Sequence, residues 1–230
     1  MKIFASDYDG TFIRRNPTPG ELEGNIKQIT RWREAGNLFI FATGRDMHDM
    51  LSILPKELVC DYLVCINGGI VAMCDGKIIS EEIIPQHIAD EIIAMINKMD
   101  IKNQWLRNVK ENGLGSIAFE VETPAAALKI ADSLAKKFEG KVTVVSNEQC
   151  VDIAAHGVTK ATGIALIAKK YSIADGDVFC IGDSHNDLPM LSAYNGFTLP
   201  GVDGAVMAVA NEVHCSVGGA LRGLMDNYFL

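Results

Sequence analysis

Short, fully apolar segments that each end in polar residues recur along this chain, and they constrain its fold more than any other feature. The stretches between them carry apolar residues at helical spacing, as at Leu22, Ile26 and Ile29. Strands that are apolar on both faces are typical of parallel sheets covered by helices. The sequence therefore predicts an α/β fold with a doubly wound parallel sheet. The expected strands are residues 2–6, 38–42, 62–66 and 177–181.

The pattern changes in the middle of the chain. Asp75-Gly76 between two short apolar runs is a strong hairpin signal. An αββαββ order follows it, and adjacent strands in that order indicate a small α+β domain inserted into the parallel one. We expect residues 1–82 and 156–230 to form the core and residues 83–155 to form the insertion. The inserted elements are helices at 85–99 and from 124, and strands at 104–110, 116–122, 141–146 and 149–154.

Polar residues follow the expected core strands at the point where each strand ends. Asp7 and Asp9 follow the first strand, Thr43 follows the second, and Asn67 follows the third. Asp183 follows the strand after the insertion. The carboxyl ends of parallel strands share one edge of the sheet, where ligands bind in open α/β folds. We therefore expect these residues to converge on one site.

The charges at this edge predict its chemistry. Asp7, Asp9, Asp183 and Asp187 would crowd a small volume, and such like charges destabilise each other unless a cation is present. Oxygen ligands of this kind suit Mg²⁺, and Lys160 adds a compact positive charge. Acids, a metal and a lysine together favour phosphoryl transfer, in which an enzyme mainly positions groups and neutralises charge.

Two aspartates at positions i and i+2 can divide the labour of such a reaction. One carboxylate can act as a nucleophile, and the other can donate and accept a proton. Gly10 permits the sharp turn that lets Asp7 and Asp9 face one pocket. Thr43 offers a hydroxyl to a phosphoryl oxygen.

Structural roles remain open for several of these residues. Thr43 could cap the helix expected from Asp46, and Asn186 could cap the helix after it. Lys160 could be a solvated residue of a first helical turn, although a cation there is mildly unfavourable with the helix dipole. Asn67 could stabilise a turn, and Arg45 could form a structural ion pair. We hold Arg45 and Asn67 as supporting site residues.

Four segments resemble the motifs of one enzyme superfamily, that of the haloacid dehalogenases. Asp7-Tyr8-Asp9-Gly10-Thr11 resembles motif I, Thr43-Gly44-Arg45 resembles motif II, and Lys160 resembles motif III. Gly182-Asp183-Ser184-His185-Asn186-Asp187 resembles motif IV. The insertion is similar to the C2B cap of the subfamily that includes Cof-type sugar phosphatases, sucrose-phosphatase and archaeal phosphoglycolate phosphatases. The resemblance implies a Rossmann-like core with an inserted cap domain.

The resemblance also implies roles for the matched residues. Asp7 is then the nucleophile and a Mg²⁺ ligand, Asp9 is the general acid/base and gives its backbone carbonyl to the metal, and Asp183 is the third protein ligand. The remaining residues surround the phosphoryl group. Thr43, Gly44 and Lys160 bind it, Asn186 contacts substrate, and Asp187 orients Lys160 or a metal-bound water.

The implied function is a Mg²⁺-dependent phosphatase that forms an aspartyl-phosphate and acts on a small phosphomonoester, such as a sugar phosphate or a phosphoglycolate-like metabolite. Two alternatives stay open. A phosphomutase of the phosphomannomutase type would return the phosphoryl group to a sugar, and a non-catalytic module would only bind a phosphorylated ligand. We expect one or two cap or hinge residues to face the substrate. The candidates are His87, Trp105, Arg107, Lys110 and His156.

The bulk properties limit partners and location. A net charge of −8 argues against nucleic-acid binding, which requires a basic patch. No apolar stretch approaches the ~18 residues of a membrane span, and no secretory signal precedes Asp7. We expect a cytoplasmic protein whose partner is a small phosphorylated metabolite, and the sequence does not distinguish a monomer from a homodimer. The 6 cysteines form no C-x-x-C pair, so we expect buried, reduced thiols.

Overall fold

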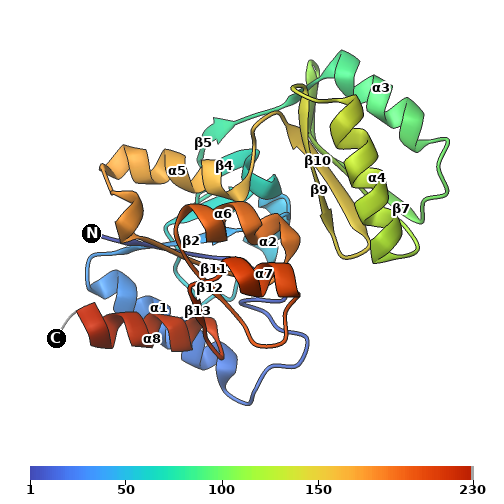
Figure 1. Ribbon diagram of the computed structural model, residues 1–230. Coiled ribbons are helices and arrows are strands. Elements are labelled where there is room, and N and C mark those ends of the chain that lie inside the picture. The colour runs from blue at the N-terminus through green and yellow to red at the C-terminus, as the bar shows by residue number, and fades with distance from the viewer. Residues whose placement is uncertain (229–230) are drawn as a thin grey trace.

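The strands of the protein form two separate sheets (Figure 1). The computed structural model describes residues 1–228. The larger sheet has eight strands in the order β13-β12-β11-β1-β2-β3-β4-β5. Strands from β13 to β3 are parallel, and the last two pairings are antiparallel. The strands are β1 (Ile3–Ser6), β2 (Leu38–Ala42), β3 (Tyr62–Cys65), β4 (Ile70–Met73), β5 (Ile78–Glu81), β11 (Val178–Gly182), β12 (Asn195–Thr198) and β13 (Glu212–Val213).

Helices cover both faces of this sheet, which explains why its central strands are apolar throughout. Phe4 of β1 packs in a cluster with residues of α1, α2 and α8. Its neighbours Ile3 and Ala5 point to the opposite face, against α5, α6 and α7. Figure 1 shows α1 with α8 on one side and α5 with α6 on the other. The predicted doubly wound α/β fold is confirmed. The helices are α1 (Glu21–Glu34), α2 (Met47–Ile53), α5 (Lys160–Tyr171), α6 (Leu188–Ala193), α7 (Gly204–Val209) and α8 (Val217–Tyr228).

The second sheet is antiparallel and carries two helices on one face (Figure 1). Its element order contains the predicted αββαββ sequence, preceded by the short strand β6. The division into domains at 1–82, 83–155 and 156–230 stays a prediction. The elements are β6 (Ile84–Pro85), α3 (Gln86–Ile96), β7 (Asn103–Lys110), β8 (Gly113–Glu120), α4 (Pro124–Lys137), β9 (Val142–Asn147) and β10 (Cys150–Ala155).

Alternation along β10 gives the second sheet two different faces. Val151 and Ile153 are fully buried against α3 and α4. Asp152 lies between them in sequence, so its side chain points to the face without helices. On that face Asp152 is opposite Ala118 of β8, and Ala118 is opposite Trp105 of β7. The helix-free face therefore presents polar and aromatic side chains.

One expectation about the cysteines is wrong. Cys60 and Cys74 form a disulfide with a Cα–Cα distance of 6.1 Å. The antiparallel pairing of β3 with β4 sets Tyr62 opposite Met73 and so brings the two flanking cysteines together. This proximity depends on strand register and leaves no motif in the sequence. The other four have free thiols: Cys65 and Cys180 are buried, Cys150 is partly exposed and Cys215 is exposed.

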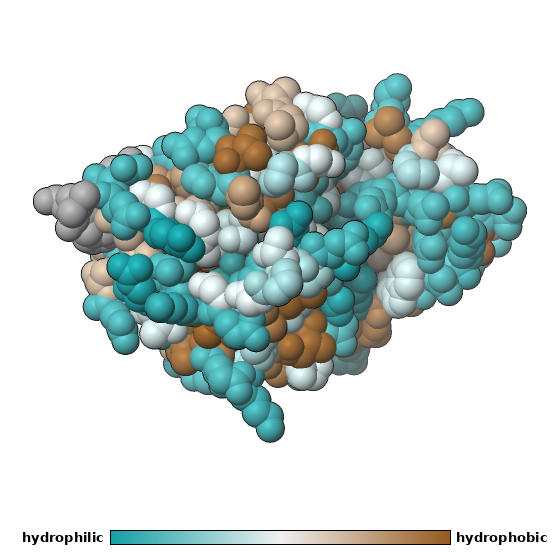
Figure 2. Space-filling model, turned by 90° about the horizontal axis from the view of Figure 1, so that it is seen from below, coloured by the Kyte–Doolittle hydropathy of each residue, from teal (hydrophilic) through white to brown (hydrophobic). Residues whose placement is uncertain are grey.

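Among residues 1–228, no helix combines the length and the apolarity that crossing a bilayer requires. On the face shown in Figure 2, hydrophilic residues dominate and hydrophobic ones form separated patches.

Candidate active site

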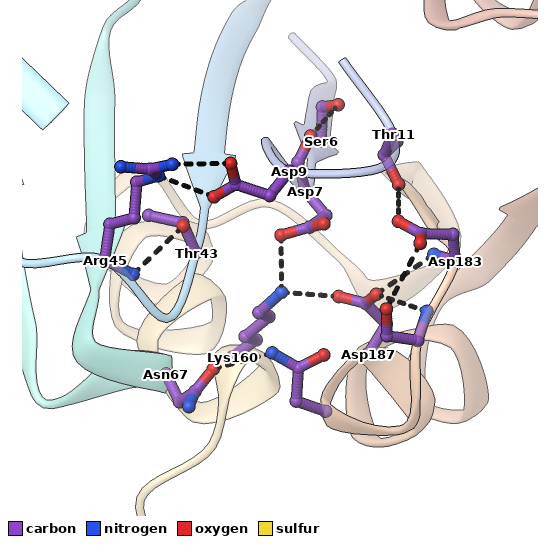
Figure 3. A network of polar contacts seen from close by, with 12 residues as sticks. Ser6, Asp7, Asp9, Thr11, Thr43, Arg45, Asn67, Lys160, Asp183 and Asp187 are labelled. Atoms are coloured by element: carbon purple, nitrogen blue, oxygen red, sulfur yellow. Dashed lines mark hydrogen bonds and ion pairs between the residues drawn. The ribbon is translucent and has the colours of Figure 1, made fainter. Parts of the chain in front are cut away.

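Four strand ends converge at the carboxyl edge of the larger sheet, as their sequence positions predict. The backbone N–H of Asp7, just after β1, donates to the carbonyl of Ile181 at 2.9 Å. The N–H of Thr43, just after β2, donates to the carbonyl of Val64 at 2.8 Å. These continuations of the parallel ladder place Asp7, Thr43 and Asp183 beside one another at the edge. Figure 3 shows Asp7 between Thr43 on one side and Asp183 on the other.

Lys160 occupies the middle of this group (Figure 3). It is the first residue of α5, which Thr159 caps by accepting a hydrogen bond from the N–H of Thr162. The side chain of Lys160 is fully buried, and its Nζ donates to Oδ1 of Asp7 and to Oδ1 of Asp187, each at 2.6 Å. Burial opposes its charge, but the attraction of the two carboxylates outweighs burial and raises the pKa of Lys160 above its usual range. Lys160 is therefore a fixed cation.

Asp187 is held from both sides. While Oδ1 accepts from Lys160, Oδ2 accepts from the backbone N–H groups of Asp183 and Ser184, each at 3.0 Å. A Cβ at Gly182 would come within 2.4 Å of the Asp187 side chain, so the close approach requires glycine. Both carboxylate oxygens are thus occupied, and the observed contacts of Asp187 fit the orienting role implied for it.

Three carboxylates at this edge form an acidic cluster. One oxygen from each of Asp7, Asp183 and Asp187 lies within 4.8 Å of the others. Thr11 donates a short hydrogen bond to Oδ1 of Asp183. Gly10 has a φ of 86°, and a Cβ there would overlap the Asp183 carboxylate. The turn that carries motif I is therefore shaped around Asp183.

Burial raises the pKa of the Asp7 carboxyl well above its usual range; Lys160 opposes this effect, and the carboxylates of Asp187 and Asp183 add to it. Burial likewise raises the pKa of Asp183. A further positive charge beside these carboxyls would favour their ionised forms. An all-oxygen donor set with excess negative charge fits a hard divalent cation such as Mg²⁺.

Asp9 faces away from this cluster. Its carboxylate accepts two hydrogen bonds from Arg45, 2.6 Å from Nε and 2.7 Å from Nη2 (Figure 3). The pair is partly solvent-exposed, and its hydrogen bonding raises the pKa of Arg45. Only the backbone carbonyl of Asp9 is left for the metal role implied by the sequence. The ion pair that the sequence left open for Arg45 therefore has a defined partner in the site.

The loop after β2 presents the Thr43 hydroxyl. Thr43 is 1% exposed, its carbonyl accepts from the N–H of Asn67 at 2.9 Å, and its Oγ1 accepts from the N–H of Arg45 at 3.1 Å. The hydroxyl hydrogen stays available to an acceptor outside the loop. A Cβ at Gly44 would lie 3.4 Å from Asn67, so the loop packs closely there.

Asn67 and Asn186 connect the two sheets. Asn67 has a φ of 52°, a left-handed conformation that asparagine tolerates better than most residues. Nδ2 of Asn186 donates to Oδ1 of Asn67 at 3.1 Å, and both residues line a small pocket that Asp152 of β10 also lines. Oδ1 of Asn186 is buried and has no partner among the described residues. Polar residues of the core site and of the helix-free face of the second sheet thus line the same pocket.

A cavity of about 310 Å³ lies between this edge and that face. Trp105 and Arg107 of β7 line it, whereas Lys110 pairs with Glu81 at 3.0 Å and does not. Sequence reasoning missed Asp152 and Cys150, which also line it. The available signal for Asp152 was an acidic residue inside an otherwise apolar strand. The core contributes Asp7, Asp9, Thr43, Gly44, Arg45, Asp49 and Asn186 to the lining.

A family model described as haloacid dehalogenase-like hydrolase matches residues 4–112 and 106–214. A 5-amino-6-(5-phospho-D-ribitylamino)uracil phosphatase of Bacillus subtilis is 20% identical over 83% of this chain and 80% of its own length. A phosphoglycolate phosphatase of Nitrosopumilus maritimus is 28% identical over 82% of this chain and 78% of its own length.

Solved structures support the fold. A sugar phosphatase of haloacid dehalogenase subclass IIB superposes with a TM-score of 0.77 at 17% identity, covering 100% of this chain and 99% of the other. At 17% identity this similarity supports the fold alone, that is, the arrangement of both sheets. The arrangement of a parallel-sheet core and a second, antiparallel sheet is therefore one that a subclass IIB protein shares.

Proposed function

The chain belongs to the haloacid dehalogenase-like hydrolases, as a phosphatase of that family, and we propose that it hydrolyses a small phosphomonoester through an aspartyl-phosphate on Asp7 with the help of Mg²⁺. The observation that carries this proposal is the position of the Asp7 carboxylate. It lies 2.6 Å from a buried lysine, within 4.8 Å of two further carboxylates, and beside a cavity. A lone buried acid would be neutral, whereas Lys160 together with a bound Mg²⁺ would keep this one ionised and nucleophilic.

The first step is attack by one Asp7 carboxylate oxygen on the phosphorus. The bond from phosphorus to the leaving oxygen breaks, and Asp9 donates a proton to that oxygen. The other side chains act on charge and position: Lys160 and the Thr43 hydroxyl neutralise and hold the phosphoryl oxygens. Asp187 keeps Lys160 in place through its 2.6 Å contact.

In the second step Asp9 changes from proton donor to proton acceptor. Asp9 now accepts a proton from water, which attacks the phosphorus and frees Asp7. Arg45 binds both oxygens of Asp9, so one of these contacts must open before that oxygen carries a proton, while the other keeps the carboxyl oriented for both transfers. Arg45 is therefore a positioning residue in this proposal.

The residues proposed to hold Mg²⁺ are Asp7 and Asp183 through their carboxylates and Asp9 through its backbone carbonyl. When bound, the metal would neutralise negative charge shared by these acids and the phosphoryl group. The second sheet would cover the cavity, exclude bulk water and contact the leaving group.

The test is a phosphate-release assay over a panel of small phosphomonoesters, with Mg²⁺ and with a chelator. We expect turnover only with the metal, and a phosphorylated wild-type protein after rapid acid quench. Asp7→Asn should lose both signals, whereas the exposed Asp132→Asn should keep them. Absence of turnover across the panel would favour a binding module, and a requirement for a sugar bisphosphate activator would favour a phosphomutase.

A further inference from the structure

Arg107 and Asp152 form an ion pair in the wall of the cavity. Arg107 is opposite Ser116 on one side of β8, and Asp152 is opposite Ala118 on its other side, so both side chains occupy the helix-free face. Nη1 of Arg107 lies 3.4 Å from Oδ1 of Asp152. The side chains are 24% and 13% exposed, which leaves the pair only partly screened by water.

The cavity offers no uncompensated cation for a second anionic group. Four carboxylates line it, from Asp7, Asp9, Asp49 and Asp152, against two guanidinium groups. Each guanidinium already has an acidic partner: Arg45 binds Asp9, and Arg107 binds Asp152. Lys160, which borders the same site, is committed to two aspartates. The phosphoryl group, which would bind together with a divalent cation, is therefore the one anionic group of a substrate whose charge this cavity would neutralise.

The polar groups in the cavity wall favour ligand groups that donate hydrogen bonds. Asn67 presents Oδ1 to Nδ2 of Asn186 at 3.1 Å. This contact leaves Oδ1 of Asn186 as an acceptor without a partner among the described residues. The exposed indole of Trp105 adds an apolar surface against which a carbon chain can pack.

We infer that Asp152 sets specificity by neutralising Arg107, so that the cavity takes phosphomonoesters with an uncharged, hydroxylated leaving group and rejects those with a carboxylate. This inference rests on the proposed function and narrows its substrate class. A substrate carboxylate at Arg107 would compete with Asp152 for one guanidinium and would place two like charges together. A hydroxyl in the same place meets no such repulsion.

Matched substrates isolate the leaving-group charge. 2-Phosphoglycolate and ethylene glycol monophosphate differ only by a carboxylate in place of a hydroxymethyl group, and so do 3-phosphoglycerate and glycerol 3-phosphate. We expect the hydroxymethyl member of each pair to have the higher kcat/KM, by at least about tenfold, a change expected of one partly desolvated charge contact. Equal values or a preference for the carboxylates would overturn the inference.

The variant Asp152→Asn tests the residue itself. Its side chain keeps the shape of the aspartate, but it no longer neutralises Arg107. We expect kcat/KM for the carboxylate substrates to rise by about tenfold relative to their partners, and the double variant Asp152→Asn/Arg107→Gln to lose this gain. Glu81→Gln, which removes the partner of Lys110 outside the cavity, should leave the ratio unchanged. Circular dichroism and urea unfolding confirm that each variant is folded.

Hydrolysis of p-nitrophenyl phosphate separates the two proposals. It reports the chemistry on Asp7 and carries no carboxylate. If the wild-type protein hydrolyses it but Asp152→Asn leaves the ratio within each matched pair unchanged, the specificity inference fails and the proposed function stands. If the wild-type protein with Mg²⁺ hydrolyses no phosphomonoester, the proposed function fails, and the inference falls with it.

Discussion

Arg45 grips the carboxylate of Asp9 with two hydrogen bonds of 2.6 and 2.7 Å, and it joins the second and first motifs through their side chains. The backbone N–H of Arg45 also donates a hydrogen bond to the hydroxyl oxygen of Thr43 in the same loop. The proposed proton donor and a proposed phosphate ligand are thus positioned by one residue.

Replacing Arg45 by methionine should therefore slow catalysis more than it destabilises the fold. We expect kcat for an alkyl phosphate to fall by about 10²-fold, within the range of general acid catalysis. The fall should be smaller for p-nitrophenyl phosphate, whose leaving group needs less protonation. Stability should change by less than about 1 kcal/mol because the pair is partly exposed.

The control for that variant is Arg15→Met. Arg15 also binds a carboxylate with two contacts, 3.1 and 2.9 Å to Glu148, but on the exposed surface. If both variants lower kcat equally, or if the two phosphates respond alike to Arg45→Met, the positioning role is wrong.

Lys160→Met should destabilise the protein. It would leave the buried carboxylates of Asp7 and Asp187 without their shared cation. Removing one member of a buried ion pair costs about 3–5 kcal/mol. Urea unfolding in a chelator should show this loss, and Lys129→Met on α4 provides a lysine control outside the cavity. A loss below about 1 kcal/mol would contradict the buried-network interpretation.

Mg²⁺ should raise the melting temperature of the wild-type protein. A ligand that binds only the folded state at 100 times its Kd adds about 2.7 kcal/mol to stability. Asp183→Asn should weaken the shift because it removes a proposed ligand from the acidic cluster. Differential scanning calorimetry across a Mg²⁺ titration measures the effect, and an undiminished shift in Asp183→Asn would place the metal elsewhere.

Reduction of the Cys60–Cys74 disulfide should lower stability without lowering activity. A cross-link that closes a loop of about 15 residues contributes about 3 kcal/mol in the chain-entropy model, and the sequence separation here is 14. The bond lies before β3, at the opposite end of that strand from Asn67. Urea midpoints with and without dithiothreitol measure the difference. The double variant Cys60→Ser/Cys74→Ser should be insensitive to the reductant, and a fall in kcat on reduction would refute the separation from the site.

The sequence by itself determined the larger sheet and the residues at its edge. Periodicity is a local property, so Ile3, Phe4 and Ala5 already indicate a strand covered on both faces. Parallel strands share their carboxyl edge, and this rule alone brings Asp7 and Asp183 together from distant parts of the chain.

Only the tertiary structure decided which side chains pair. Three contacts show this: the Asp9–Arg45 ion pair, the Cys60–Cys74 disulfide and the Arg107–Asp152 ion pair. Each joins residues from different segments, and those segments meet only because of how the strands pair within the two sheets. A shift of one residue in register moves a side chain to the other face of its sheet, and the meeting of segments far apart in the chain is not a local property of the sequence. The chemistry proposed for the site therefore follows from the motifs, whereas the proposed choice of leaving group rests on contacts that only folding creates.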